Sequence, residues 1–252
     1  MKIFILGGIV GNNNAKIKAS QQETLKKTFQ TIAADLVREN HELIVCSAFE
    51  DSADYYALLG ASCVVGELSS QPTIEYHYPD LPGVETQIKT LTDSLNLTKV
   101  RYFSHLSPSQ LQTSDANKHA WMLAQITALN TSHIVLTLGG KLDGSASLML
   151  RIAEANRKTI IPLRFLGGTA AQAYDRIQYE LKDKLNDDIS ILNDANRINE
   201  VAQLVNKTAT AGPHKSKGAK TSEYFISYAR DRPESADYIC LLYTSPSPRD
   251  RG

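Results

Sequence analysis

The sequence has little of what marks several specialised classes of protein. Its 252 residues include only three cysteines, Cys46, Cys63 and Cys240, and their spacing matches no metal site. We therefore interpret them as reduced thiols of the protein core. No apolar run approaches the ~20 residues that a membrane-spanning helix needs, and the apolar N-terminal stretch is too short for a signal peptide. The composition predicts a soluble, cytoplasmic protein without membrane association.

An excess of charge of one sign is also missing. The chain carries 27 Lys and Arg against 27 Asp and Glu, so its formal net charge is zero. A binding surface for nucleic acid or for an anionic membrane usually shows a basic excess, so we expect neither partner. A local pocket for a small anion remains compatible with this balance.

The most informative segment is a glycine-rich turn that follows an apolar run. Residues 134–138 read as a buried strand, residues 139–146 contain three glycines, and Ser147 to Asn156 repeats apolar residues at helical spacing. Such a strand, loop and helix suit an anion, because glycines let backbone N–H groups approach it and the helix begins with its positive end there. The pattern is neither the dinucleotide fingerprint nor the Walker loop, and an ordinary tight turn is the open alternative.

Two further glycine corners follow predicted strands. Gly7 and Gly8 come after residues 3–6, and Gly167 and Gly168 come after residues 159–163. The last corner also carries Arg164, whose guanidinium suits bidentate contact with a phosphate, although a surface ion pair is the alternative. Three such corners in one β/α alternation favour nucleotide binding.

The rest of the chain alternates strands and helices. We expect further strands over 43–46, 73–78 and 100–103, and helices over 23–39, 53–65, 83–95, 115–129, 170–185 and 198–205. The prolines around residues 73–78 suggest a strand near an edge of the sheet. This alternation predicts an α/β fold, a Rossmann-like parallel sheet flanked by helices on both faces. Ser47 and Glu50 follow the strand 43–46, where either ligand binding or helix capping would use them.

With these motifs in view, residues 1–205 resemble the SLOG superfamily of Rossmann-like nucleotide-sensing domains, in the branch associated with Sir2 and TIR effectors of bacterial anti-phage systems. The matching segments are 74–80, 138–146 and 161–170. The resemblance implies a nucleotide-derived ligand, namely a cyclic ADP-ribose isomer, ADP-ribose or NAD, with no other cofactor required. It also implies a homo-oligomer whose assembly responds to the ligand.

The C-terminal part has a different character. Residues 206–222 are rich in Lys, Ser, Thr, Ala and Gly, and we expect a flexible basic linker. Residues 223–239 resemble the truncated start of a TIR domain, a class that often cleaves NAD through a glutamate in a later part of its fold. Residues 240–252 resemble translated sequencing-adapter sequence, with a natural proline-rich tail as the alternative, and we exclude them from fold reasoning.

The expected site brings the three corners together around a ligand. Its residues are Gly7, Gly8, Ser47, Gly139, Gly140, Lys141, Gly144, Ser145, Arg164, Gly167 and Gly168. The phosphates would lie against Gly139, Gly140 and the helix start, and Lys141 and Arg164 would neutralise their charge.

We assign no catalytic residue and no metal ligand. A hydrolase would need a poised acid or base, and the candidates Glu75, Asp143 and Glu154 are isolated in the sequence, as is His105. Sensing is therefore the preferred function. Nucleotide hydrolysis and a scaffold that assembles without a ligand are the alternatives.

Overall fold

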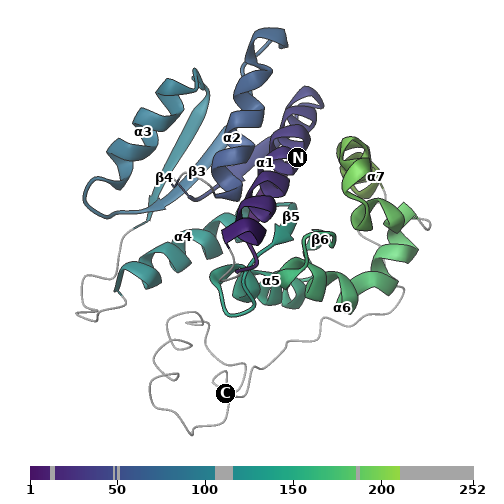
Figure 1. The fold of residues 1–252 in the computed structure, drawn as a ribbon. Helices are drawn as coiled ribbons and strands as arrows, with labels where there is room; N and C mark the ends of the chain where they lie inside the picture. The colour runs from purple at the N-terminus through teal and green to yellow at the C-terminus, as the bar shows by residue number, and fades with distance from the viewer. Residues whose placement is uncertain (12–14, 48, 50–51, 106–115, 186–187, 211–252) are drawn as a thin grey trace, which may run out of the picture. The chain divides into compact units, whose positions relative to one another are not determined.

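A computed structural model describes residues 1–11, 15–47, 49, 52–105, 116–185 and 188–210. The residues from Met1 to Gly212 form one compact unit around a six-stranded sheet. The strands are β1 (Lys2–Gly8), β2 (Glu42–Val45), β3 (Ile74–Pro79), β4 (Val100–His105), β5 (Ile134–Gly139) and β6 (Thr159–Leu163). They lie in the order β4-β3-β2-β1-β5-β6, and every neighbouring pair is parallel (Figure 1). The predicted α/β, Rossmann-like fold is confirmed.

Helices cover both faces of this sheet. They are α1 (Ala15–Arg38), α2 (Ala53–Cys63), α3 (Val84–Ser94), α4 (Ala116–Thr131), α5 (Ser145–Ala155), α6 (Gly168–Leu185) and α7 (Val201–Thr210), with short 3-10 turns at Val65–Glu67, Asp188–Asn193 and Ala195–Glu200. On β1, Ile3 and Ile5 join a core formed with α1, α2 and α7, whereas Phe4 and Leu6 join one formed with α4 and α5. Because both faces are buried, the central strands are nearly continuous apolar runs.

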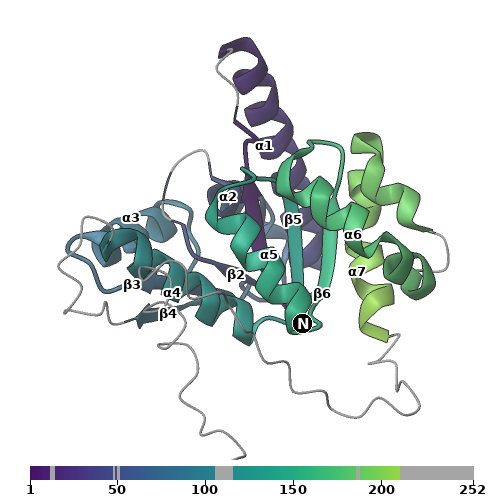
Figure 2. The same ribbon diagram turned by 90° about the horizontal axis from the view of Figure 1, so that it is seen from below.

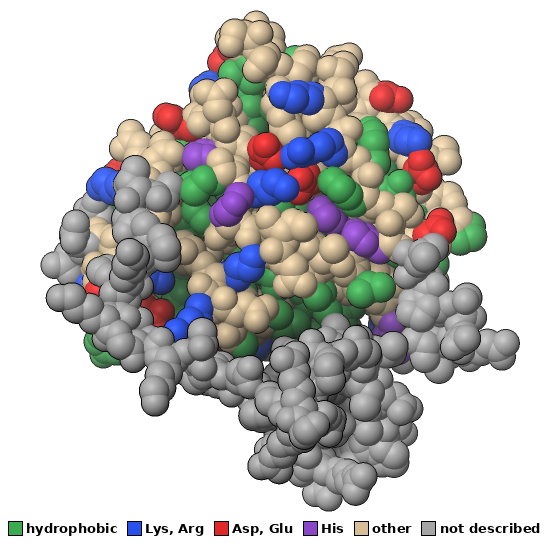
Figure 3. Space-filling model, turned by 180° about the vertical axis from the view of Figure 1, so that it is seen from behind, with side chains coloured by type: hydrophobic (Ala, Val, Ile, Leu, Met, Phe, Trp, Pro, Cys, Tyr) green, Lys and Arg blue, Asp and Glu red, His purple; other side chains and the backbone are tan. Residues whose placement is uncertain are grey.

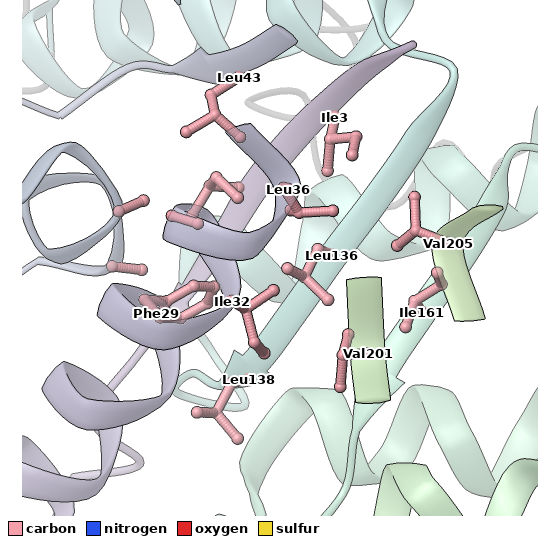
Figure 4. Close-up of a cluster of buried hydrophobic side chains, with 14 of the residues drawn as sticks. Ile3, Phe29, Ile32, Leu36, Leu43, Leu136, Leu138, Ile161, Val201 and Val205 are labelled. Carbon is pink, nitrogen blue, oxygen red and sulfur yellow. The ribbon is translucent and has the colours of Figure 1, made fainter. Parts of the chain in front are cut away.

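The larger core lies between α1 and the sheet. Phe29, Ile32 and Leu36 recur at helical spacing on α1 and are fully buried (Figure 4). They meet inward residues of four strands and of α7, drawn in the same view: Ile3, Leu43, Leu136, Leu138, Ile161, Val201 and Val205. This packing holds the parallel strands in place, so the carboxyl ends of all six lie at the same end of the sheet.

Helix α1 begins earlier than its apolar pattern indicates. The prediction started at residue 23, but the helix starts at Ala15, and residues 16–20 are all exposed. Figure 2 shows this end of α1 extending beyond the sheet. A helix turn that packs against nothing needs no apolar side chains, so hydrophobic periodicity cannot reveal it.

The prediction that β3 lies near an edge of the sheet agrees with the strand order, because β3 is next to the outermost strand β4, and all six of its residues are buried. The structure corrects two further expectations. Helix α7 continues to Thr210, five residues into the predicted linker, because its buried residues and the bond from His41 Nε2 to Asn206 Oδ1 (2.7 Å) hold it on the core. Cys46 is a buried free thiol as expected, but Cys63 is exposed at the end of α2.

Residues 106–115 and 211–252 lie outside the described part of the chain, so the predicted TIR start and tail are not placed. Among the described residues, none of the helices combines the length and apolarity required to cross a lipid bilayer. The side opposite to that of Figure 1 carries basic, acidic and histidine side chains interspersed over its centre (Figure 3). That view therefore shows no single-signed patch of the kind that binds nucleic acid.

Candidate functional site

The three glycine corners meet at the carboxyl end of the sheet, where β1, β5 and β6 finish. This end is called the carboxyl edge below. From β1 the chain builds outward to β4 and then returns to the other side of β1 with β5 and β6. The order of strands therefore reverses between β1 and β5, and Gly8 pairs with Gly139 at that point. Ligands of open α/β sheets bind beyond the carboxyl ends of the strands at such a reversal. The sequence prediction that these corners converge is thus met by the topology.

The corners are joined backbone to backbone. The Gly140 N–H donates to the Gly8 carbonyl (2.7 Å), and the Thr169 N–H donates to the Gly140 carbonyl (3.0 Å). A Cβ atom at Gly139 would lie 2.2 Å from the Gly8 oxygen, so only glycine permits this approach. The Gly140 N–H is consequently engaged within the protein, and Gly139 and Gly140 are buried. These two glycines form the floor of the site, and their role is close packing.

The start of α5 offers the donors that the buried glycines do not. Gly144 occupies the N-cap position, and no side chain caps the helix there. The Ser147 N–H donates to the Gly144 carbonyl (3.0 Å), and the N–H groups before it belong to the first turn of a helix, where such groups lack a helical acceptor and attract anions. Ser145 is exposed beside them, and so is Lys141, whose side chain passes Gly11 and Gly144 within van der Waals distance of a Cβ at either position. This cluster is the part of the predicted site best suited to a phosphate.

Arg164 contacts side chains of α6 and not the start of α5. Its Nε bonds Asp175 Oδ1 (3.1 Å), and its guanidinium lies over the Tyr174 ring, 5.6 Å from the centroid. Both partners belong to α6, and the two charged side chains are each about half exposed (50% and 53%). The surface ion pair raised as the alternative is therefore present. Binding of a phosphate by Arg164 would require it to leave this pair.

Ser47 is held rigidly at the end of β2. The Asp54 carboxylate accepts the N–H groups of Cys46 (3.3 Å) and Ser47 (3.2 Å), and the Tyr76 hydroxyl donates to the Ser47 carbonyl. Burial raises the pKa of the Asp54 carboxyl from 3.8 to about 7, against the stabilising effect of the two N–H bonds on the ionised form. The Ser47 hydroxyl accepts the Phe49 N–H (3.3 Å). Glu50 lies outside the described residues.

Sequence reasoning missed Asp54, Tyr76 and Phe49. Asp54 stands in the first turn of α2, where an acidic residue ordinarily signals only the helix dipole. Its bonds to the end of β2 depend on how α2 packs, which the sequence pattern does not specify. A phenylalanine in an otherwise polar strand-end loop was the one available signal for Phe49.

Of the three acidic candidates for catalysis, two are committed elsewhere. Glu75 is buried near the start of β3 and pairs with Lys2 (2.7 Å) and Arg101 (2.8 Å). Glu154 makes a bidentate pair with Arg176, whose Nε donates to Oε2 (3.0 Å) and whose Nη2 donates to Oε1 (2.5 Å), and both side chains are half-buried. Asp143 alone is exposed beside the start of α5.

His105 is a packed residue, as the non-catalytic interpretation held. Its Nε2 lies 3.0 Å from His77 Nδ1, and the two rings stack with centroids 5.2 Å apart. Burial and the neighbouring histidine lower the pKa of His77 to about 4, and burial lowers that of His105. The pair joins β3 to the edge strand β4, with His77 buried and His105 partly buried.

In comparison with protein-family models and with curated proteins, no match to this chain is found. The fold and the edge geometry define the class to which the described residues correspond: a Rossmann-like α/β domain. Its strand-order reversal carries three interlocked glycine corners and an uncapped helix start.

Proposed function

We propose that this chain binds a nucleotide-derived signal at the carboxyl edge of its sheet, as a SLOG-like sensor that controls a C-terminal TIR effector in anti-phage defence. The ligand is a cyclic ADP-ribose isomer, ADP-ribose or NAD, and its binding alters self-association. The observation that carries the proposal is the convergence of the three glycine corners with the exposed, uncapped start of α5 at the strand-order reversal.

Two features support sensing over hydrolysis. Glu75 and Glu154 are each neutralised by basic side chains, so neither is available as a general base at the edge. The described part of the site is built from backbone groups, one lysine and one serine, which suit binding of phosphate without turnover. Asp143 makes nucleotide hydrolysis the second candidate function, because this acidic residue is exposed and lies in the loop directly before the start of α5.

Charge reversal at the helix start tests the site. Isothermal titration of the full chain with each of the three ligands should detect binding, and Lys141→Glu should weaken it at least about tenfold, because a phosphate would then face a carboxylate. Lys99→Glu is the matched control, since Lys99 is also exposed but precedes β4, at the amino ends of the strands. Equal affinities of both variants and the wild type would place the ligand elsewhere. Ligand-free assembly that persists in Lys141→Glu would favour the scaffold function.

A further inference from the structure

Phe49 is an aromatic side chain that the fold holds in solvent beside the proposed site. Its side chain is 56% exposed, in the loop between β2 and α2. Its backbone is fixed at both ends, because its N–H donates to Ser47 Oγ (3.3 Å) and its carbonyl accepts the Ser52 hydroxyl (2.8 Å). Ser52 is in turn the N-cap of α2. Because the Phe49 ring is largely exposed and its backbone is held in place, packing in the core does not account for its position.

Trp121 provides a second ring next to it. The two ring centroids lie 5.5 Å apart, and the planes are inclined by 51°. Trp121 stands in the second turn of α4, is half-buried and packs against the larger core. Since α4 follows β4, its first turns lie at the carboxyl edge of the parallel sheet. The pair therefore places aromatic surface at the same edge as the glycine corners.

The spacing of the strands relates this pair to the phosphate-binding candidates. β2 and β5 lie on either side of β1, so their ends are two strand spacings apart, about 10 Å. Phe49 follows β2 through Ser47, and the uncapped start of α5 follows β5. Helices α4 and α5 pack against the same face of the sheet. An anion and a planar ring belonging to one nucleotide-sized molecule would span these two positions.

We propose that Phe49 and Trp121 form the stacking surface for the adenine base of the nucleotide-derived ligand. This inference rests on the proposed function and adds the part of the ligand that the glycine corners leave unrecognised. Bases stack on aromatic side chains largely irrespective of sequence or substituents, because every base presents a π-face. Selectivity for the attached sugar and phosphates then comes from the rest of the edge.

The composition of the chain supplies a direct probe. Trp121 is its single tryptophan, so intrinsic fluorescence reports on this position alone. The full chain is titrated with cyclic ADP-ribose, ADP-ribose and NAD, which all carry adenine, and with ribose 5-phosphate, which does not. We expect saturable quenching of Trp121 by at least one adenine-containing ligand and none by ribose 5-phosphate.

Matched variants separate stacking from general surface effects. Phe49→Ala should weaken binding of the quenching ligand by about tenfold or more, and Phe49→Tyr should retain it. Tyr179→Ala is the control, because Tyr179 is a 77% exposed aromatic residue on α6 and should leave affinity unchanged. Circular dichroism verifies that each variant folds, as expected for changes at exposed positions.

The outcomes distinguish this inference from the function on which it rests. Calorimetric binding without fluorescence change and without an effect of Phe49→Ala would overturn the stacking surface and leave the sensor intact. If none of the three adenine-containing ligands binds by calorimetry, both proposals fail together. Quenching that Phe49→Ala weakens and Tyr179→Ala does not would support both.

Discussion

Gly167 and Gly168 are adjacent in the turn before α6, and both have positive φ angles, +78° and +67°. They differ in their surroundings. A Cβ at Gly168 would lie 2.3 Å from the Gly140 oxygen and 2.9 Å from a Val10 methyl group, whereas one at Gly167 would meet nothing within 4 Å. The two positions therefore separate backbone strain from loss of the close approach between corners.

Alanine at these positions should have unequal costs. We expect Gly167→Ala to lower the free energy of unfolding by about 1–2 kcal/mol through its positive φ alone. Gly168→Ala should lower it by roughly 3 kcal/mol or more, because backbone atoms must also move apart. Urea denaturation of the full chain measures both. Similar losses for the two variants would contradict the interlocked arrangement of the corners.

Asp54 should make the free energy of unfolding depend on pH. Its carboxyl ionises near pH 3.8 in the unfolded chain but near pH 7 in the folded protein, because burial disfavours the charge. Between these values the folded state keeps a proton that the unfolded state has lost, so its contribution to stability falls as pH rises from about 4 to about 7 and is constant above.

Comparison with variants isolates this contribution. The difference in unfolding free energy between wild type and Asp54→Asn should change with pH across that window, to the disadvantage of the wild type as pH rises. Asp175→Asn is the control, since it removes a carboxylate that is half exposed and lies on a different element. Parallel profiles for wild type and Asp54→Asn would show that the carboxyl is not desolvated.

Residue types alone indicated only part of the site. Glycine runs after apolar segments located the corners, because few other residues suit such turns. The same pattern could not reveal that Gly140 donates its N–H to Gly8, or that Arg164 turns toward Asp175. Such partners lie on elements far apart in the sequence, and only the packed fold brings them together.

At the scale of elements, α5 and α6 form a pair. Both begin at the candidate site, and the Glu154–Arg176 bridge joins them further along. The bidentate geometry and partial burial make this bridge stronger than a typical surface pair. It therefore helps to fix the direction of the two helices relative to each other, and with it the spacing of their first turns.

A double-mutant cycle measures this bridge. Glu154→Gln, Arg176→Met and the double variant should give a coupling energy of about 1–2 kcal/mol in urea denaturation. The exposed Glu85–Lys89 pair, four residues apart on α3, should give no more than about 0.5 kcal/mol. Equal coupling in the two cycles would mean that the bridge does not hold the helices together.

The sequence predicted the order of the helices and strands, but it predicted their first and last residues less well. Apolar runs and helical periodicity identified the six strands, since buried elements must carry apolar residues. Prediction failed where burial is absent, at the exposed first turns of α1. At β3 the strand was predicted, but its pattern could not show that Glu75 and His77 are buried, because ion pairing and stacking with other strands bury them.

At the scale of the whole molecule, the features on which the proposed sensor function depends lie in the compact unit that begins at Met1. The strand-order reversal, the interlocked corners and the aromatic pair all lie at one edge of one sheet. We propose that a ligand held there contacts the first turns of α5 and α6 and biases self-association through these helices, which lead along the chain to α7.

The most direct test of this central claim is to titrate the full chain with cyclic ADP-ribose, ADP-ribose and NAD, and to recover and analyse each ligand after saturation. The account predicts that one of them binds stoichiometrically, is returned chemically intact, and binds less tightly to the Lys141→Glu variant. A recovered ligand that is cleaved by the wild type would make this chain a hydrolase. The absence of binding by all three would leave the glycine corners as structural turns.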